Sequence, residues 1–92
     1  MIVRIATEGQ YRFPGALIDR LKELDRHIVE AVANEDRHLF DKLYAEMVSL
    51  VKNQGEPVSH DQIMESELIL PPPDITMKEA KELFARPDLV SG

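Results

Sequence analysis

The chain has 92 residues, of which 43% are hydrophobic and 30% are charged, and its formal net charge is −6. Its 11 basic residues are scattered among 17 acidic ones, which disfavours binding to nucleic acid or directly to anionic lipid, since both rely on clustered cations. The absence of cysteine excludes disulfides, thiolate metal sites and thiol nucleophiles. This length and composition predict one globular domain over residues 1–92.

The N-terminal segment predicts a β-hairpin. Residues 2–5 and 11–13 are rich in β-branched and aromatic side chains, and they flank the turn-like pair Glu8-Gly9. Pro14 then suits the first position of a helix, where its missing amide hydrogen costs nothing.

Two helices are expected next, over residues 15–33 and 37–53. Asn34 can end the first helix, Asp36 can cap the second, and Gly55 can stop it. The apolar stripe of the first helix is Leu17, Leu21, Leu24, Ile28 and Ala31. The residues of the second helix expected to face inward are Leu39, Phe40, Leu43, Met47, Leu50 and Val51. Because the link is so short, the two helices should lie antiparallel.

The C-terminal part combines a short strand near residues 67–70, three prolines and a final helix from about 77 to 85. Prolines donate no backbone hydrogen bond, so the strand must end there and the helix follows on a stiff spacer. Thr76 and Glu79 form a capping box for that helix. The predicted fold class is α+β: a small antiparallel sheet, made of the N-terminal hairpin and the later strand, packed on an antiparallel helical hairpin, with a short C-terminal helix.

Three segments in order, 1–14, 51–57 and 70–74, resemble the PspA-associated proteins, also called the PspAA domain. The resemblance covers nearly the whole chain. It implies a small α+β protein associated with phage-shock protein A (PspA), the membrane-binding coiled-coil protein of the bacterial and archaeal envelope stress response. It implies no catalytic residue, so we expect a non-enzymatic accessory or adaptor protein that needs no cofactor and acts by protein contact.

The sequence also bears on the membrane. No apolar stretch approaches the roughly 18 residues that span a bilayer, so direct membrane insertion is not expected. The apolar run at residues 2–6 is too short for a signal peptide. We therefore expect a cytoplasmic protein that is recruited to the inner face of the membrane through PspA.

Candidate partner-binding residues come from the second helix and from the prolines. With Tyr44 and Val48 included, the apolar positions of that helix cover roughly half its circumference, wider than the ~100° stripe of a surface helix. Either the helix touches both its partner helix and the sheet, or part of this face binds a second copy in a homodimer or a coiled-coil partner. Tyr44 and Val48 lie farthest from the leucine seam and are expected to be exposed. Pro71, Pro72 and Pro73 form either a rigid connector or a polyproline ligand.

No residue pattern predicts a catalytic, cofactor-binding or metal site. His27, His38 and His60 lack the four-residue helical spacing of a metal pair. Many carboxylates lie at helical spacing from opposite charges, as Asp41 does from Arg37, which is typical of a solvated face. Two alternatives to an adaptor stay open: a self-associating structural module, and, less favoured, a small metal-binding protein or hydrolase.

Overall fold

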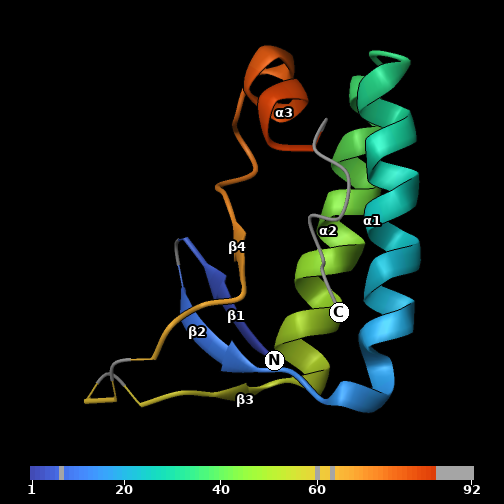
Figure 1. Ribbon diagram of the computed structural model, residues 1–92. Helices are drawn as coiled ribbons and strands as arrows, with labels where there is room; N and C mark the ends of the chain where they lie inside the picture. Colours follow the sequence, from blue (N-terminus) through green and yellow to red (C-terminus); the bar gives the residue numbers. More distant parts are fainter. Residues whose placement is uncertain (7, 60, 63, 85–92) are drawn as a thin grey trace.

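A computed structural model describes residues 1–6, 8–59, 61–62 and 64–84. A four-stranded sheet packs on one side of two long antiparallel helices, and a short helix lies at the end where those two helices meet (Figure 1). The predicted α+β class is therefore confirmed. The strands are β1 (Ile2–Ile5), β2 (Gly9–Arg12), β3 (Glu56–Pro57) and β4 (Leu68–Leu70). The helices are the 3-10 turn η1 (Gly15–Leu17), α1 (Ile18–Ala33), α2 (Arg37–Gln54) and α3 (Met77–Phe84).

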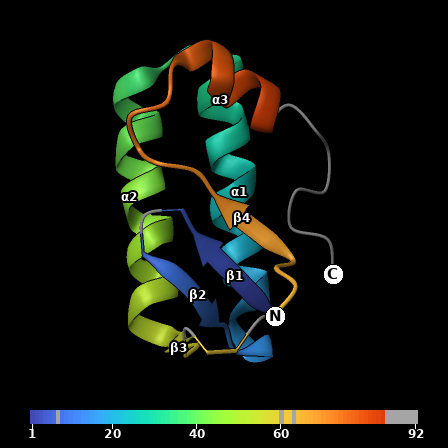
Figure 2. The same ribbon diagram turned by 90° about the vertical axis from the view of Figure 1, so that its left-hand side faces the viewer.

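The sheet has the strand order β3-β2-β1-β4, and it is mixed. The predicted hairpin is present as β1 and β2, and Gly9, the first residue of β2, has a φ of 101°. The expectation of a purely antiparallel sheet is wrong, because β4 runs parallel to β1. After β3 the chain returns to the end of the sheet where β1 begins, and the Glu67 amide donates to the Ile2 carbonyl at 2.9 Å. From there β4 leads towards α3 (Figure 2).

The strand β3 pairs with the outer edge of β2. Pro57 is tolerated there because an edge strand need not donate on its outer side. Gly55 does end α2 as predicted, but its φ of −88° is open to any residue. A Cβ on Gly55 would lie 2.5 Å from the Val51 carbonyl oxygen and 3.2 Å from the Tyr11 Cβ. Glycine is needed here because a side chain would clash with the last turn of α2 and press against β2.

The core lies between the sheet, α1, α2 and α3. Four of the five stripe residues predicted for the first helix are buried, and Leu17 is half-buried. On α2 the buried face is Phe40, Tyr44, Met47 and Val51. The expectation that Leu39 faces inward is wrong, since its side chain is 40% exposed. The sheet and α3 cover the side of α2 that carries Tyr44. Leu39 lies outside the area that they cover.

The helix boundaries follow the predicted capping signals. The Leu39 amide donates to the Asp36 carboxylate at 3.1 Å, and α1 ends at Ala33 with Asn34 as its C-cap. The capping box of α3 has both its bonds, from the Glu79 amide to the Thr76 hydroxyl at 3.1 Å and from the Thr76 amide to the Glu79 carboxylate at 3.0 Å. The expected fraying of 88–92 falls outside the described residues.

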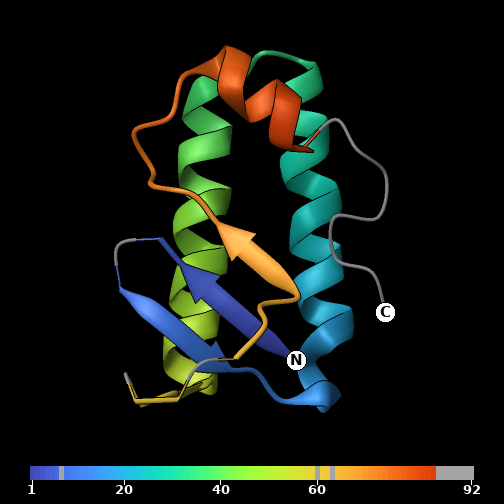
Figure 3. The ribbon, with the colours of Figure 1, turned by 60° about the vertical axis from the view of Figure 1, so that its left-hand side comes forward.

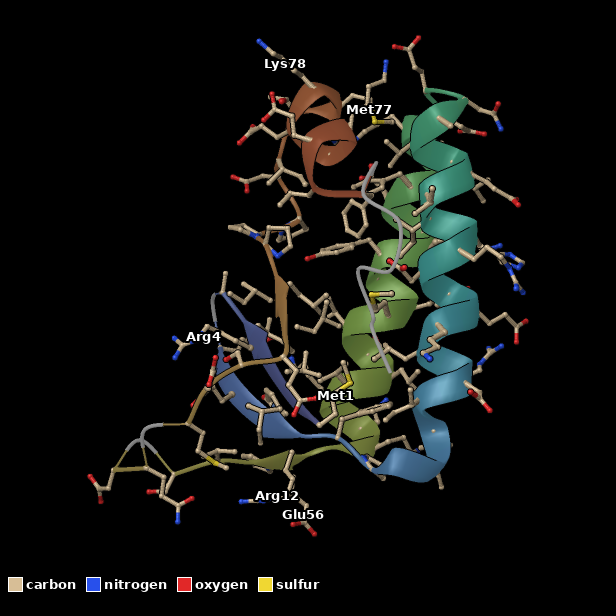
Figure 4. All side chains as sticks on the ribbon, viewed as in Figure 1. Met1, Arg4, Arg12, Glu56, Met77 and Lys78 are labelled. Carbon is tan, nitrogen blue, oxygen red and sulfur yellow. The ribbon has the colours of Figure 1, made fainter. Side chains whose placement is uncertain are left out.

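The helix α3 is attached to the helical hairpin by Met77 and Lys81. Met77 points toward the helical hairpin and Lys78 points away from it (Figure 4). Lys81 forms an ion pair with Glu35, the residue with a φ of 55° in the turn between α1 and α2. This contact joins α3 to the helical hairpin across the surface.

Candidate partner groove

A groove of about 520 Å³ runs along α2, beside the segment that leads from β4 to α3. Figure 3 shows this segment, residues 71–74, passing along α2 on its way to α3. On α2 the lining residues extend from Arg37 to Ser49, and β1 and the turn after it contribute Ile5 and Glu8. The apolar part of the groove is formed by Ile5, Tyr44, Ala45, Val48, Pro71 and Pro73.

The proline segment is held against α2 by its carbonyl groups. The Tyr44 hydroxyl donates to the Pro71 carbonyl oxygen. The Arg37 guanidinium donates to the Pro73 carbonyl oxygen at 3.1 Å and also to the Ile75 carbonyl oxygen. The carbonyls of Pro71, Pro73 and Ile75 therefore face α2, and two side chains of α2 supply all three donors. This wall of the groove is fixed by the helix beneath it.

Arg37 is engaged on its other sides as well. Its Nε lies 3.0 Å from the Asp41 carboxylate, and its guanidinium lies 5.4 Å from the centre of the Phe40 ring. Below it, the rings of Phe40, Tyr44 and Phe84 pack with centroid distances of 5.5 to 6.2 Å. Burial raises the pKa of Tyr44, so its hydroxyl stays a donor at neutral pH. This end of the groove is a closely packed aromatic and cationic cluster.

The charges along the groove are mostly paired within the protein. Glu8 binds Lys52 at 2.8 Å, and this hydrogen bond raises the pKa of Lys52. Asp41 binds Arg37. Among the described residues, no ion pair is formed by Asp74, the third carboxylate of the lining. Asp74 is exposed at the rim and leaves the groove with an uncompensated negative charge.

Four of the five predicted partner-binding residues line this groove: Tyr44, Val48, Pro71 and Pro73. Pro72 is not part of the lining. The expectation that Tyr44 is exposed is wrong, because only 2% of its surface is accessible. The proline segment and Phe84 cover its ring, so Tyr44 supports the groove from below while the half-buried Val48 is more open to a partner.

Side chains capable of other chemistry lie apart from one another. Within the described part of the chain, no group of three histidine or acidic residues could hold a metal ion. His27 and His38 are exposed on different helices, and His60 falls outside the described residues. Asp25 is buried in α1, which raises the pKa of its carboxyl, and it is absent from the groove lining.

The comparison with known families agrees with the resemblance carried by the sequence. The family described as PspA-Associated protein matches residues 1–92, the whole chain. The chain belongs to this family. Its name implies an association with PspA. No curated protein and no solved structure matches the chain significantly. In the part that the structure describes, no helix has the length and apolar character needed to cross a membrane.

The arginine that fixes the groove wall in this PspA-associated protein was not foreseen from the sequence. The spacing of Arg37 and Asp41 indicates only a surface ion pair. The proline run is the feature of the sequence that could have indicated this wider role of Arg37. Three prolines have carbonyls that still need donors, and the apolar strand before them offers no side-chain donor.

Proposed function

We propose that this protein is a non-enzymatic adaptor that binds a PspA-type coiled-coil protein through the groove along α2. Family membership supports the partner. The observation that carries the proposed site is the convergence of Tyr44, Val48, Pro71 and Pro73 from distant parts of the chain on one apolar groove. The adaptor acts in the cytoplasm and reaches the inner face of the membrane through PspA.

The groove is better suited to binding than to catalysis. Its two strongest donors, the Tyr44 hydroxyl and the Arg37 guanidinium, are used to hold the proline segment. A general acid or base needs a titratable group free to face a substrate, and a nucleophile needs an activating base beside it. What the groove offers a partner is apolar surface with carboxylates on its rim.

The test is a calorimetric titration of the purified protein with the PspA encoded by the same organism. Val48→Asp places a charge in the middle of the apolar wall and should weaken binding at least about tenfold. Leu39→Asp is the matched control, because Leu39 is an exposed apolar residue of the same helix outside the groove. It should leave binding unchanged. Circular dichroism and thermal melting verify that both variants are folded.

Two results would contradict this proposal. Absence of binding when both wild-type proteins are folded rules out the adaptor role. Loss of binding in Leu39→Asp but not in Val48→Asp would place the interface on the side of α2 that carries Leu39.

A second candidate function is a self-associating structural module. It is favoured by three large apolar side chains that are exposed among the described residues, Leu39, Ile69 and Leu83, of which Ile69 is 58% exposed. Sedimentation velocity on the protein alone separates the two functions. A mass that rises with concentration, and that Ile69→Lys returns to the monomer, supports self-association, whereas a monomer at all concentrations refutes it.

A further inference from the structure

We infer that the groove accepts one face of a helix whose apolar seam is flanked by lysine or arginine, and that Asp74 meets this basic flank. The inference rests on the proposed function and specifies which kind of segment of the partner binds. It follows from the hydrogen-bonding state of the groove walls, the length of the groove and its charge.

The backbone of the groove cannot pair with an extended peptide. Pro71, Pro72 and Pro73 have no amide hydrogen, and the carbonyls of Pro71, Pro73 and Ile75 already accept from α2. The opposite wall is a helix, whose backbone is bonded internally. An added β-strand gains its affinity from main-chain hydrogen bonds, and neither wall provides a ladder for them. The backbone groups of a helix are hydrogen-bonded to one another, so a partner helix needs no backbone hydrogen bonds from the groove.

The length of the groove fits about three turns of a partner helix. Its lining on α2 extends from Arg37 to Ser49, which at 1.5 Å per residue is about 18 Å. Its volume of about 520 Å³ is that of a small-ligand pocket, too small for the body of a helix and suited to a row of side chains. We therefore expect apolar side chains spaced i, i+4 and i+7 to contact Val48, Ala45 and Pro71.

A small polar ligand fits less well. Such sites use a few free polar groups to fix the orientation of the ligand. Here Arg37 and the Tyr44 hydroxyl are occupied within the protein, and Glu8 is bound to Lys52. Asp74 is the lining carboxylate that has no ion pair among the described residues, and a carboxylate prefers a cationic donor.

The charge of the groove determines which charged residues should flank the apolar seam of the partner helix. Glu8 and Asp41 each have a cation within 3.0 Å, but Asp74 has none among the described residues. The whole chain has a net charge of −6, which adds a long-range attraction for a basic partner surface. A lysine or arginine beside the apolar seam would pair with Asp74 at the open rim. Charges at a rim act mainly on the association rate and on its salt dependence.

The experiment uses Asp74→Lys and stopped-flow titration with the same PspA. At low salt we expect binding to weaken about threefold to tenfold, mostly through slower association, and the difference to disappear at about 0.5 M salt. Asp74→Asn, which removes the charge without reversing it, should give an intermediate loss. Glu30→Lys is the matched control, because it changes the net charge equally on an exposed site of α1 outside the groove. It should have less than half the effect.

A second arm uses two synthetic helical peptides with the same leucine seam, one flanked by lysine and the other by glutamate. The wild-type protein should prefer the lysine peptide, and Asp74→Lys should remove or reverse this preference. If Val48→Asp abolishes PspA binding while Asp74→Lys leaves it unchanged, the basic flank is refuted and the adaptor role stands. Equal losses in Asp74→Lys and Glu30→Lys also refute the inference, since the effect then belongs to net charge. If Val48→Asp has no effect either, the groove itself is refuted as the binding site.

Discussion

The hydroxyl of Tyr44 offers a direct test of how the proline segment is held. Tyr44→Phe removes one oxygen atom and leaves the ring packed between Phe40 and Phe84. The lost bond to the Pro71 carbonyl is partly buried. A hydrogen bond contributes about 0.5–1.5 kcal/mol net, and an unpaired carbonyl at a half-buried site adds to the loss. We expect a decrease of about 1–2 kcal/mol in the free energy of unfolding.

Urea unfolding at pH 7 measures this decrease, and in thermal melts it should appear as a fall of roughly 4–15 °C for a chain of this size. Tyr44→Ala is the comparison: it also removes the buried ring and should cost about 3–5 kcal/mol. A change below about 0.3 kcal/mol in Tyr44→Phe would mean that the bond to Pro71 does not hold the segment.

The pH dependence provides a second readout of the same group. Burial raises the pKa of Tyr44 above its usual value of 10.0, so the folded protein holds this proton more tightly than the unfolded chain. The resulting stability is fully present below about pH 10 and is lost as the pH rises beyond it. Wild-type protein should therefore lose stability between about pH 9.5 and 11 more steeply than Tyr44→Phe. Parallel curves for the two proteins would contradict the burial of a protonated hydroxyl.

Three further predictions concern the fold. Leu24→Ala, in the buried stripe of α1, should cost about 2–5 kcal/mol in urea unfolding, and a loss below roughly 0.5 kcal/mol would mean that this face of the helix is not buried. Thr76→Ala removes one half of the capping box and should cost about 0.5–2 kcal/mol; hydrogen exchange in Met77–Phe84 should speed up, and unchanged exchange there would argue against the cap. Gly55→Ala should destabilise by about 1–3 kcal/mol through overpacking, whereas Gly15→Ala, which meets nothing within 4 Å, should change little in the same thermal melt; equal effects would refute the close approach.

Features that depend on a few adjacent residues were predicted correctly from the sequence. The Asp36 cap of α2 and the capping box of Thr76 and Glu79 each follow from side chains that bond to the backbone three residues away. Their geometry is local, so tertiary contacts cannot easily change it. The direction of β4 is different, because it depends on the path of the chain between Pro57 and Leu68, where no strong local signal sets the course.

The orientation of α2 shows the same limit at the candidate site. Periodicity identifies both Leu39 and Tyr44 as apolar positions, but it does not show which neighbour covers each one. The sheet, α3 and the proline segment all lie on the Tyr44 side, and these are contacts between distant parts of the sequence. Four of the candidate residues therefore line one groove, whereas Tyr44 was predicted to be exposed and is buried.

The contacts that stabilise the fold also shape the groove. Its proline wall is stiff by covalent structure, and Arg37 and Tyr44 fix it to α2 through three carbonyl groups. A partner helix would therefore meet a surface that is already formed, and little conformational entropy would be lost on binding. Tyr44→Phe links the two roles, since a looser wall should weaken binding of PspA although the hydroxyl points to Pro71 and not to the partner. If stability falls as calculated while PspA affinity is unchanged, the wall is needed for the fold but its rigidity does not contribute to recognition.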